Sequence, residues 1–343
     1  MIAPPSAEVG LAARKRMDAL AKPTGSLGRL EDLAVWISAC QGVCPPRLLE
    51  RVRAVVLAGD HGVSHVGVSA YPREVTAAMM RAFAAGIAGA SVLARQHGVA
   101  LRVLDLGVDD DLAGLPAALR QHKVRRSSGA IHLTDGLSHA DTDQALAAGV
   151  AIADEEIAAG ADLLIVGDLG IGNTTPAAAL IAATFAAGAR EVTGRGTGLD
   201  ADQVRHKTAV IAQALARVGH RARDPMDRLS ALGSADLAAG VGFVRRAADC
   251  GVPVLLDGVV SVAVACLAEN LDPGVLAWCA AGHRSTEPAQ RLALARSGLA
   301  PVLDLGLRLG EGSGAIAAVP LLRSAVLLVR EMGLLDDLAT PPH

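Results

Sequence analysis

Aromatic residues are scarce in this chain. Of its 343 residues, three are Phe, two are Trp and one is Tyr, whereas proteins that grip single-stranded nucleic acid stack the bases on several aromatic rings. An excess of charge of one sign is missing as well, because 32 Lys and Arg face 35 Asp and Glu and leave a formal net charge of −3. Since binding to phosphate backbones needs a basic excess, the sequence predicts no nucleic-acid partner.

Long uninterrupted apolar runs are also missing. The two best candidates are 252–268, broken by Asp257, and 315–329, broken by Pro320 and Arg323. Neither supplies the roughly 20 consecutive apolar residues that a membrane helix requires, and the first residues do not form a secretory signal. The five cysteines are odd in number and show no C-x-x-C spacing, which favours reduced thiols. We therefore expect a cytoplasmic protein without a membrane span.

Small and aliphatic residues are abundant. Hydrophobic residues make up 51% of the chain and charged residues 20%, a composition typical of a globular protein with a large core. Short runs rich in Val, Leu and Ile alternate with Ala-rich stretches of helical length. This alternation predicts an α/β fold, doubly wound around a mainly parallel sheet of about six strands. The predicted strands are 52–58, 101–106, 162–166, 252–256, 275–279 and 301–305, and the helices between them include 73–96, 141–159 and 176–187.

Both ends of the chain have the pattern of amphipathic helices. Apolar residues recur at helical spacing in 7–21 and 29–41, and a further helical stretch covers 321–338. We expect these ends to pack together. The predicted division is a small helical subdomain from residues 1–48 and 321–343, beside a large α/β domain at 49–320.

Five loops that follow predicted strands combine glycine with a carboxylate, His or Arg. Ligands of open α/β sheets bind beyond the carboxyl ends of the strands, so five such loops at one edge predict a shared cleft. A tight turn with a capping acid would explain any single one equally well. The loops are 59–62, 167–176, 257–258, 282–287 and 308–314.

The loop at 167–176 predicts an anion site at the start of a helix. Its sequence is G-D-L-G-I-G-N-T-T-P, in which the glycines allow close backbone approach, Thr174 or Thr175 can cap the next helix, and Pro176 suits the first turn. Free N–H groups and the helix dipole then favour a phosphate. The loop matches neither a Walker A motif nor G-x-G-x-x-G. A capped helix with nothing bound is the competing interpretation.

Two charged side chains could complete such a site. Lys207 follows a glycine cluster at 194–198 and could supply a point charge, although a solvated lysine explains it as well. Glu311 lies between two glycines, so a bulky ligand can approach its carboxylate, which could act as a general base if burial raises its pKa. It could equally favour the N-terminus of a helix that starts near Ser313. His61 lies in no recognised metal-binding motif, and we expect no metal site.

Six motifs occur in order along the chain. They are K-P-T-G-S-L-G-R-L-E (22–31), A-G-D-H-G-V (58–63), G-D-L-G-I-G-N-T-T-P-A-A-A (167–179), V-L-L-D-G (254–258), G-H-R-S-T-E-P-A (282–289) and R-L-G-E-G-S-G-A (308–315). Together they resemble the nicotinate-nucleotide–dimethylbenzimidazole phosphoribosyltransferases of cobalamin lower-ligand synthesis. The resemblance implies transfer of the phosphoribosyl group of nicotinate mononucleotide to 5,6-dimethylbenzimidazole, which gives α-ribazole 5′-phosphate and nicotinate. It also implies a homodimer, a Rossmann-like large domain, and catalysis without a metal or other cofactor.

The resemblance also assigns site residues. It makes Glu311 the general base and Asp168, which stands where the family also has a glutamate, a second catalytic residue. It implies a phosphoribosyl-binding set of Gly172, Asn173, Thr174, Thr175 and Lys207, and a pocket for the acceptor base lined by Tyr71, Met79, Leu169 and Leu309.

Two other functions stay open from the residues. A nucleotide-dependent oxidoreductase on a similar fold should carry G-x-G-x-x-G after the first strand, and G-D-H-G-V does not comply. A non-catalytic nucleotide sensor would be expected to lose the carboxylate at Glu311, which is present.

Overall fold

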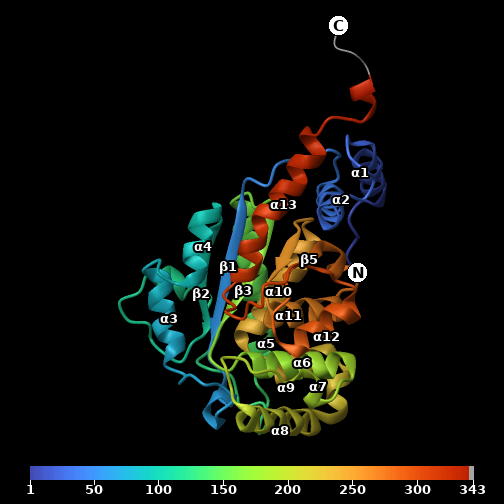
Figure 1. Cartoon of the computed structure of the whole chain (residues 1–343). Helices are drawn as coiled ribbons and strands as arrows, with labels where there is room; N and C mark the ends of the chain where they lie inside the picture. The colour runs from blue at the N-terminus through green and yellow to red at the C-terminus, as the bar shows by residue number, and fades with distance from the viewer. Residues whose placement is uncertain (340–343) are drawn as a thin grey trace.

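The strands form because short Val- and Leu-rich runs can be buried on both faces of a sheet. The computed structural model describes residues 1–339 and contains one sheet of six strands, all parallel, in the order β2-β1-β3-β4-β5-β6 (Figure 1). The predicted doubly wound α/β fold is thereby confirmed. The strands are β1 (Val52–Gly59), β2 (Ala100–Gly107), β3 (Leu163–Leu169), β4 (Val254–Leu256), β5 (Cys279–His283) and β6 (Pro301–Leu303).

The strand order contains a switch point between β1 and β3. The chain passes from β1 to β2 at the edge and returns to the other side of β1, from where β3 to β6 follow in sequence. Doubly wound folds bind ligands beyond the carboxyl ends of the strands at such a point. Ala58 pairs with Leu169 across it, so the loops that follow β1 and β3 start side by side.

Helices cover both faces of the sheet (Figure 1). The buried apolar side chains form two clusters, one on each face, as expected for strands buried on both sides. The first face carries α1 (Ala7–Ala19), α2 (Arg29–Gln41), α3 (Val75–Ala84), α4 (Gly89–His97) and α13 (Ser313–Glu331). The other face carries α5 (His139–Ala158), α6 (Thr174–Phe185), α7 (Ala189–Val192), α8 (Ala201–Val218), α9 (Pro225–Leu232), α10 (Ala235–Asp249), α11 (Val259–Leu271) and α12 (Pro288–Ser297). Short 3₁₀ helices are η1 (Gly62–Val66), η2 (Ala117–Leu119), η3 (Gly219–Arg223), η4 (Val275–Trp278) and η5 (Asp336–Ala339).

Three predicted elements are wrong in position. The helix predicted at 321–338 is part of α13, which starts at Ser313 and ends at Glu331. The run predicted as a strand at 275–279 is η4, and β5 follows it. The first four residues of β5, C-A-A-G, are small because α13 starts directly on the strand: a Cβ at Gly282 would lie 2.7 Å from the Cα of Ala315. The helix predicted at 73–96 breaks into α3 and α4 around Gly86, whose φ of 71° ends the first helix.

The two ends of the chain meet on the first face. Ala21 donates a backbone hydrogen bond to Gly333, and the Arg16 guanidinium donates to the carbonyl of Val329. α13 runs without interruption through the predicted boundary at residue 320. The division into 1–48 plus 321–343 and 49–320 stays a prediction, and 340–343 lie outside the described residues.

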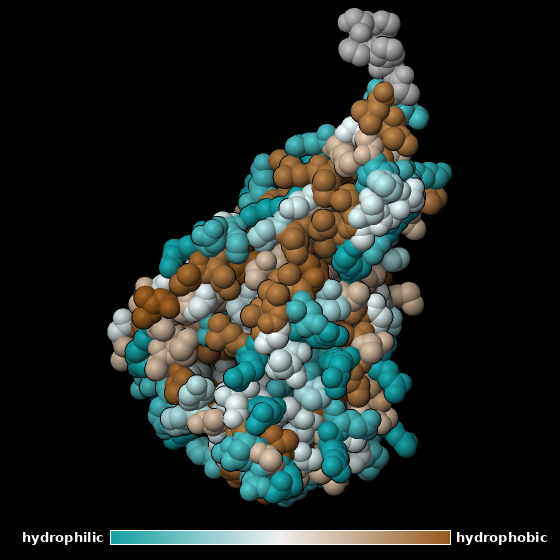
Figure 2. All heavy atoms as spheres, viewed as in Figure 1, coloured by the Kyte–Doolittle hydropathy of each residue, from teal (hydrophilic) through white to brown (hydrophobic). Residues whose placement is uncertain are grey.

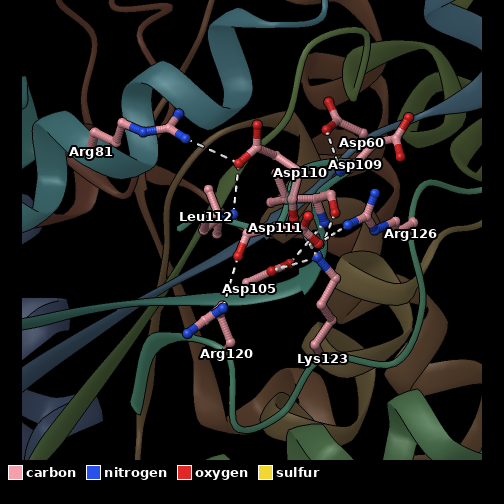
Figure 3. Close-up of polar contacts among 11 residues, drawn as sticks. Asp60, Arg81, Asp105, Asp109, Asp110, Asp111, Leu112, Arg120, Lys123 and Arg126 are labelled. Carbon is pink, nitrogen blue, oxygen red and sulfur yellow. Dashed lines mark hydrogen bonds and ion pairs between the residues drawn. The ribbon is translucent and has the colours of Figure 1, made fainter. Parts of the chain in front are cut away.

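A polar network holds the loop after β2 against the sheet and α3 (Figure 3). The Lys123 ammonium donates to the carboxylate of Asp105 and to the carbonyls of Val108 and Asp110. Arg81 of α3 pairs with the Asp110 carboxylate at 3.0 Å. The network therefore fixes the position of α3, which forms one wall of the cavity described below.

Two apolar helical segments, Val75–His97 and Ser313–Glu331, reach the length and hydropathy of a membrane span. Helices in the core of a soluble protein pass the same test, and the apolar window of α13 is 56% buried inside the protein. The first segment is divided by the break at Gly86.

Candidate active site

A cavity of about 360 Å³ opens at the carboxyl edge of the sheet. Four of the five predicted loops line it, namely those after β3, β4 and β5 and the loop before α13. The prediction for the loop at 59–62 is wrong, since no residue of it lines the cavity. It lies beneath the floor, where a Cβ on Gly170 would come within 2.1 Å of the Gly59 carbonyl oxygen. Residues 68–71, α3 and Gly196–Thr197 complete the wall.

Glu311 presents its carboxylate to this cavity from a strained turn. Its φ is 63°, a left-handed conformation rare for a side-chain-bearing residue, and Glu311 itself is 4% exposed. Ala90 at the start of α4 donates a backbone hydrogen bond of 3.4 Å to Glu311 Oε2. Burial raises the pKa of Glu311 and the nearby Asp257 raises it further, while the Ala90 hydrogen bond lowers it. This buried carboxyl with a raised pKa meets the physical requirement for a general base.

Asp257, at the end of β4, holds the turn that carries Glu311. Its two carboxylate oxygens accept hydrogen bonds from the backbone N–H groups of Gly312, Gly314 and Ala315 at 2.8 to 3.1 Å. The start of α13 is thus capped by Asp257. The competing interpretation of Glu311 as the acid at this helix start is therefore wrong, and its carboxylate faces the cavity instead.

The start of α6 lies open on the cavity. Gly172, Asn173 and Thr174 line it, and Gly172 has a φ of 89°. No side chain caps the helix, so the predicted capping by Thr174 or Thr175 is wrong. Thr175 is buried behind the loop, and its hydroxyl has no hydrogen-bond partner within residues 1–339. An uncapped helix start on a cavity wall favours an anion.

Lys207 reaches this helix start from α8. Its side chain is fully buried, and its ammonium donates a hydrogen bond of 2.6 Å to the Thr174 hydroxyl. Burial lowers the pKa of Lys207, whereas the charge of Glu287 raises it. The alternative of a solvated lysine is therefore wrong. Glu287 also accepts a hydrogen bond of 2.8 Å from Gly196 N–H and so ties down the predicted glycine cluster at 194–198.

Apolar side chains form another part of the cavity wall. Tyr71, Met79, Leu169 and Leu309, the four residues predicted for an acceptor pocket, all line the cavity. Leu169 is buried, whereas Tyr71 is 56% exposed and Leu309 57% exposed. These last two lie at the rim, where a flat apolar ring could enter. Thr76 of α3 links these residues to the loop before α6, because its hydroxyl accepts a hydrogen bond of 3.1 Å from Ile171 N–H.

Asp168 lines the floor of the cavity. Its neighbours His61 and Asp236 were not among the predicted site residues. The Oδ1 atom of Asp168 accepts a hydrogen bond of 2.7 Å from the Asn173 amide. Ligand-type atoms of His61, Asp168 and Asp236 lie within 4.8 Å of one another. Burial raises the pKa of Asp168 well above its usual range, and the charge of Asp236 adds to this effect. Asp236 was not predictable, because it lies in the first turn of a long helix without any motif.

Comparisons with known proteins point to one family. A family model described as "Phosphoribosyltransferase" matches residues 2–338. The nicotinate-nucleotide–dimethylbenzimidazole phosphoribosyltransferase of Mycolicibacterium paratuberculosis is 52% identical over 335 residues, which cover 96% of this chain and 94% of the relative. A protein of the same name from Mycobacterium tuberculosis is 51% identical over 331 residues, with 96% and 91% covered. The crystal structure of CobT from Thermus thermophilus superimposes with a TM-score of 0.92 at 41% identity and covers 98% of this chain and 100% of its own.

Proposed function

This chain belongs to the family of nicotinate-nucleotide–dimethylbenzimidazole phosphoribosyltransferases, and we propose that the cavity at its sheet edge performs the transfer with Glu311 as general base. The chain is an enzyme of the pentosyltransferase type. It transfers the phosphoribosyl group of nicotinate mononucleotide to 5,6-dimethylbenzimidazole and releases nicotinate and α-ribazole 5′-phosphate.

The proposed roles of Glu311 and of the α6 start rest on their position in one cavity. The buried Glu311 carboxylate and the uncapped start of α6 line the same cavity. A phosphate at the helix start and a base against Glu311 leave the ribose between them. The C1′ atom then lies between the leaving ring and the attacking ring, as a displacement requires.

The chemistry needs a proton acceptor and no general acid. Nicotinate bound to C1′ is a pyridinium, so it departs as a neutral ring once the glycosidic bond breaks. The attacking benzimidazole nitrogen would become cationic, and a carboxylate that accepts the proton from the other ring nitrogen removes this charge. Attack from the face opposite the leaving ring inverts C1′ and converts the β substrate into the α product.

The anion side supports binding of the 5′-phosphate. Backbone N–H groups at the α6 start and the dipole of the 12-residue helix favour a negative charge. Lys207 contributes a positive charge at the start of α6, where its ammonium donates a hydrogen bond to the Thr174 hydroxyl. The proposed phosphoribosyl set is Gly172, Asn173, Thr174, Thr175 and Lys207, with Thr175 acting from behind the loop.

The apolar side supports binding of the acceptor ring. Tyr71, Met79, Leu169 and Leu309 offer one aromatic and three aliphatic surfaces around the mouth of the cavity. Since the chain has only six aromatic residues, ring binding depends mainly on aliphatic contacts. Asp168 lines the same cavity and is proposed as the second catalytic residue, in contact with the ribose.

We also propose that the enzyme is a cytoplasmic homodimer with a small helical subdomain formed by 1–48 and 321–343. Exposed apolar side chains gather on one side of the molecule, over α13 and beside α3 and α4 (Figure 2). Ile87 is 72% exposed, Val92 50% and Leu305 67%. Contact with a second copy of the chain would bury this apolar surface. Sedimentation velocity over a range of protein concentrations tests the dimer, and a monomer at every concentration would refute it.

A direct assay tests the proposed roles. Purified protein is mixed with nicotinate mononucleotide and dimethylbenzimidazole, and the products are identified by mass and by the anomeric NMR signal. We expect α-ribazole 5′-phosphate and nicotinate in equal amounts. A β-configured product would exclude the in-line displacement, and a sugar located far from Glu311 in substrate-soaked crystals would exclude its role as base.

A further inference from the structure

Two carboxyl groups face each other on the floor of the cavity. Asp168 lines the cavity, and Asp236, from the first turn of α10, lies directly behind it. Asp236 is 1% exposed, and within the described chain neither of its side-chain oxygens has a hydrogen-bond partner. A buried carboxylate without a donor is costly, so the contact with Asp168 requires a physical explanation.

The surroundings of this pair are closely packed. His61 Nε2 lies 3.4 Å from Asp236 Oδ2. A Cβ added to Gly59 would come within 2.6 Å of Asp236 Oδ1, and one added to Gly170 would come within 2.7 Å of His61 Nε2. The glycine backbone therefore encloses Asp236 and His61, and Asp168 is the member of the group that reaches the cavity.

No Lys or Arg of residues 1–339 forms an ion pair with either carboxyl group. The charged or titratable groups near Asp168 are Asp236 of α10, Asp257 from the loop after β4 and His61 from the loop after β1. Asn173 contributes one neutral amide donor. Two adjacent carboxyl groups in a low-dielectric site cannot both be ionised, and such pairs hold one proton between them. Burial, followed by the Asp236 charge, keeps the pKa of Asp168 well above its ordinary value.

We propose that the pair Asp168 and Asp236 holds one proton and that this proton resides on Asp168, with His61 against Asp236. Asp168 then meets the bound ribose as a neutral hydrogen-bond donor and not as a base or an anion. Asp236 and His61 are then positioning residues that act through Asp168. This inference deepens the proposed function and rests on it for the identity of the ligand, but not for the state of the proton.

The position of Asp168 explains why the ribose is its partner. The backbone carbonyl of Asp168 accepts a hydrogen bond of 3.2 Å from Glu311 N–H, at the proposed site of the benzimidazole ring. The Asp168 carboxyl group accepts one from the Asn173 amide, at the proposed phosphate site. The sugar joins these two ends. A neutral Asp168 adds no further negative charge beside the 5′-phosphate, and it leaves Glu311 as the one carboxylate that takes the proton from the acceptor.

The proton can be observed without any substrate. The protein is labelled with ¹³C at the carboxyl carbon of aspartate, so that Glu311 gives no signal, and its carboxyl resonances are followed by NMR against pH. We expect one resonance of a protonated acid at neutral pH that disappears in Asp168→Asn. In Asp236→Asn the same resonance should titrate at lower pH, because the neighbouring charge is gone. Thermal melting of each variant checks that it is folded.

Two outcomes of this measurement would overturn the proposal. In the first, Asp168→Asn leaves all protonated resonances in place, which shows that Asp168 carries no proton. In the second, the protonated resonance appears only after a chelator is added, which shows that a divalent cation and not a proton lies between the carboxyl groups. Wild-type protein that shows the resonance but forms no product would refute the proposed function and leave the shared proton standing.

Kinetics then test the role of the neutral donor. Asp168→Asn keeps a neutral N–H donor at the site, so we expect its kcat/KM to stay within about tenfold of wild type. Asp168→Ala removes the donor and should lose roughly 10- to 100-fold, in the range of one hydrogen bond to a charged or reacting group. If Asp168→Asn is as impaired as Asp168→Ala, the residue acts as an anion on the positive charge that develops at the ribose, and the inference is wrong.

Discussion

Replacing Glu311 with Gln removes one proton acceptor and leaves the local structure unchanged. The amide has the length of the carboxylate, and its oxygen can still accept the hydrogen bond that Ala90 N–H donates at 3.4 Å. The backbone φ of 63° is kept, since no change in branching occurs. A raised carboxyl pKa means that the folded state binds the proton more tightly than the unfolded state, so burial of Glu311 costs stability at pH above its ordinary pKa. The neutral amide avoids this cost, and we expect Glu311→Gln to melt no lower than wild type.

The expected loss is therefore chemical and falls on kcat. General-base catalysis contributes typically ~10²–10⁴-fold, which corresponds to about 2.7 to 5.4 kcal/mol at 1.36 kcal/mol per tenfold change in rate. KM for nicotinate mononucleotide should change little, because the phosphate side contains Lys207 and the α6 start. In wild type the base must be ionised, so kcat rises with pH through the raised pKa of Glu311. The pH profile of kcat for Glu311→Gln should lack this rise.

The assay measures initial rates of nicotinate release at saturating acceptor over a range of pH. Glu331→Gln is the matched control, because Glu331 ends α13 on the exposed surface while Glu311 precedes its start. The control should retain wild-type rates at every pH. A Glu311→Gln enzyme within a few-fold of wild type, or one with the same rise of kcat with pH, would refute the role of Glu311 as base.

Two further substitutions test the parts around Glu311. Lys207→Met removes the fully buried ammonium that contacts Thr174 and should raise KM for nicotinate mononucleotide roughly 10- to 100-fold, given about 1.5–3 kcal/mol for a hydrogen bond to a charged group. Saturation kinetics measure it, and an unchanged KM would place the phosphate elsewhere. Asp257→Asn weakens the three backbone hydrogen bonds at the start of α13 and should cost about 1–3 kcal/mol of unfolding free energy. Urea denaturation measures it against the exposed Asp304→Asn, and equal stability of the two variants would contradict the capping role.

Much of the site could be predicted because its residues are close in sequence to strand ends. A glycine-rich loop after a buried strand predicts both a cleft position and backbone freedom, and Gly172, Asn173 and Thr174 line the cavity as that pattern suggests. The glycines around Glu311 likewise indicated an accessible carboxylate. The strand at 275–279 was misplaced because periodicity cannot distinguish a short apolar run in a 3₁₀ helix from a strand.

Contacts between distant segments could not be read from local pattern. Asp257 and the start of α13 are more than fifty positions apart, yet their hydrogen bonds decide that Glu311 is free to face the cavity. Lys207 and Glu287 meet only because α8 and the loop after β5 pack around the same corner. The pairing of Asp168 with Asp236 depends on the way α10 packs behind the sheet.

The sequence by itself determined the alternation of strands and helices, the edge of the sheet that binds ligand, and most of the residues that face it. These properties follow from local chemistry: apolar runs, glycine at turns, and polar groups at strand ends. Only the tertiary structure decided which carboxyl group caps a helix, which carboxyl groups lie next to each other, and which one faces the cavity and can react. The protonation of an acid depends on burial and on neighbours from other elements, and the fold alone brings those neighbours together.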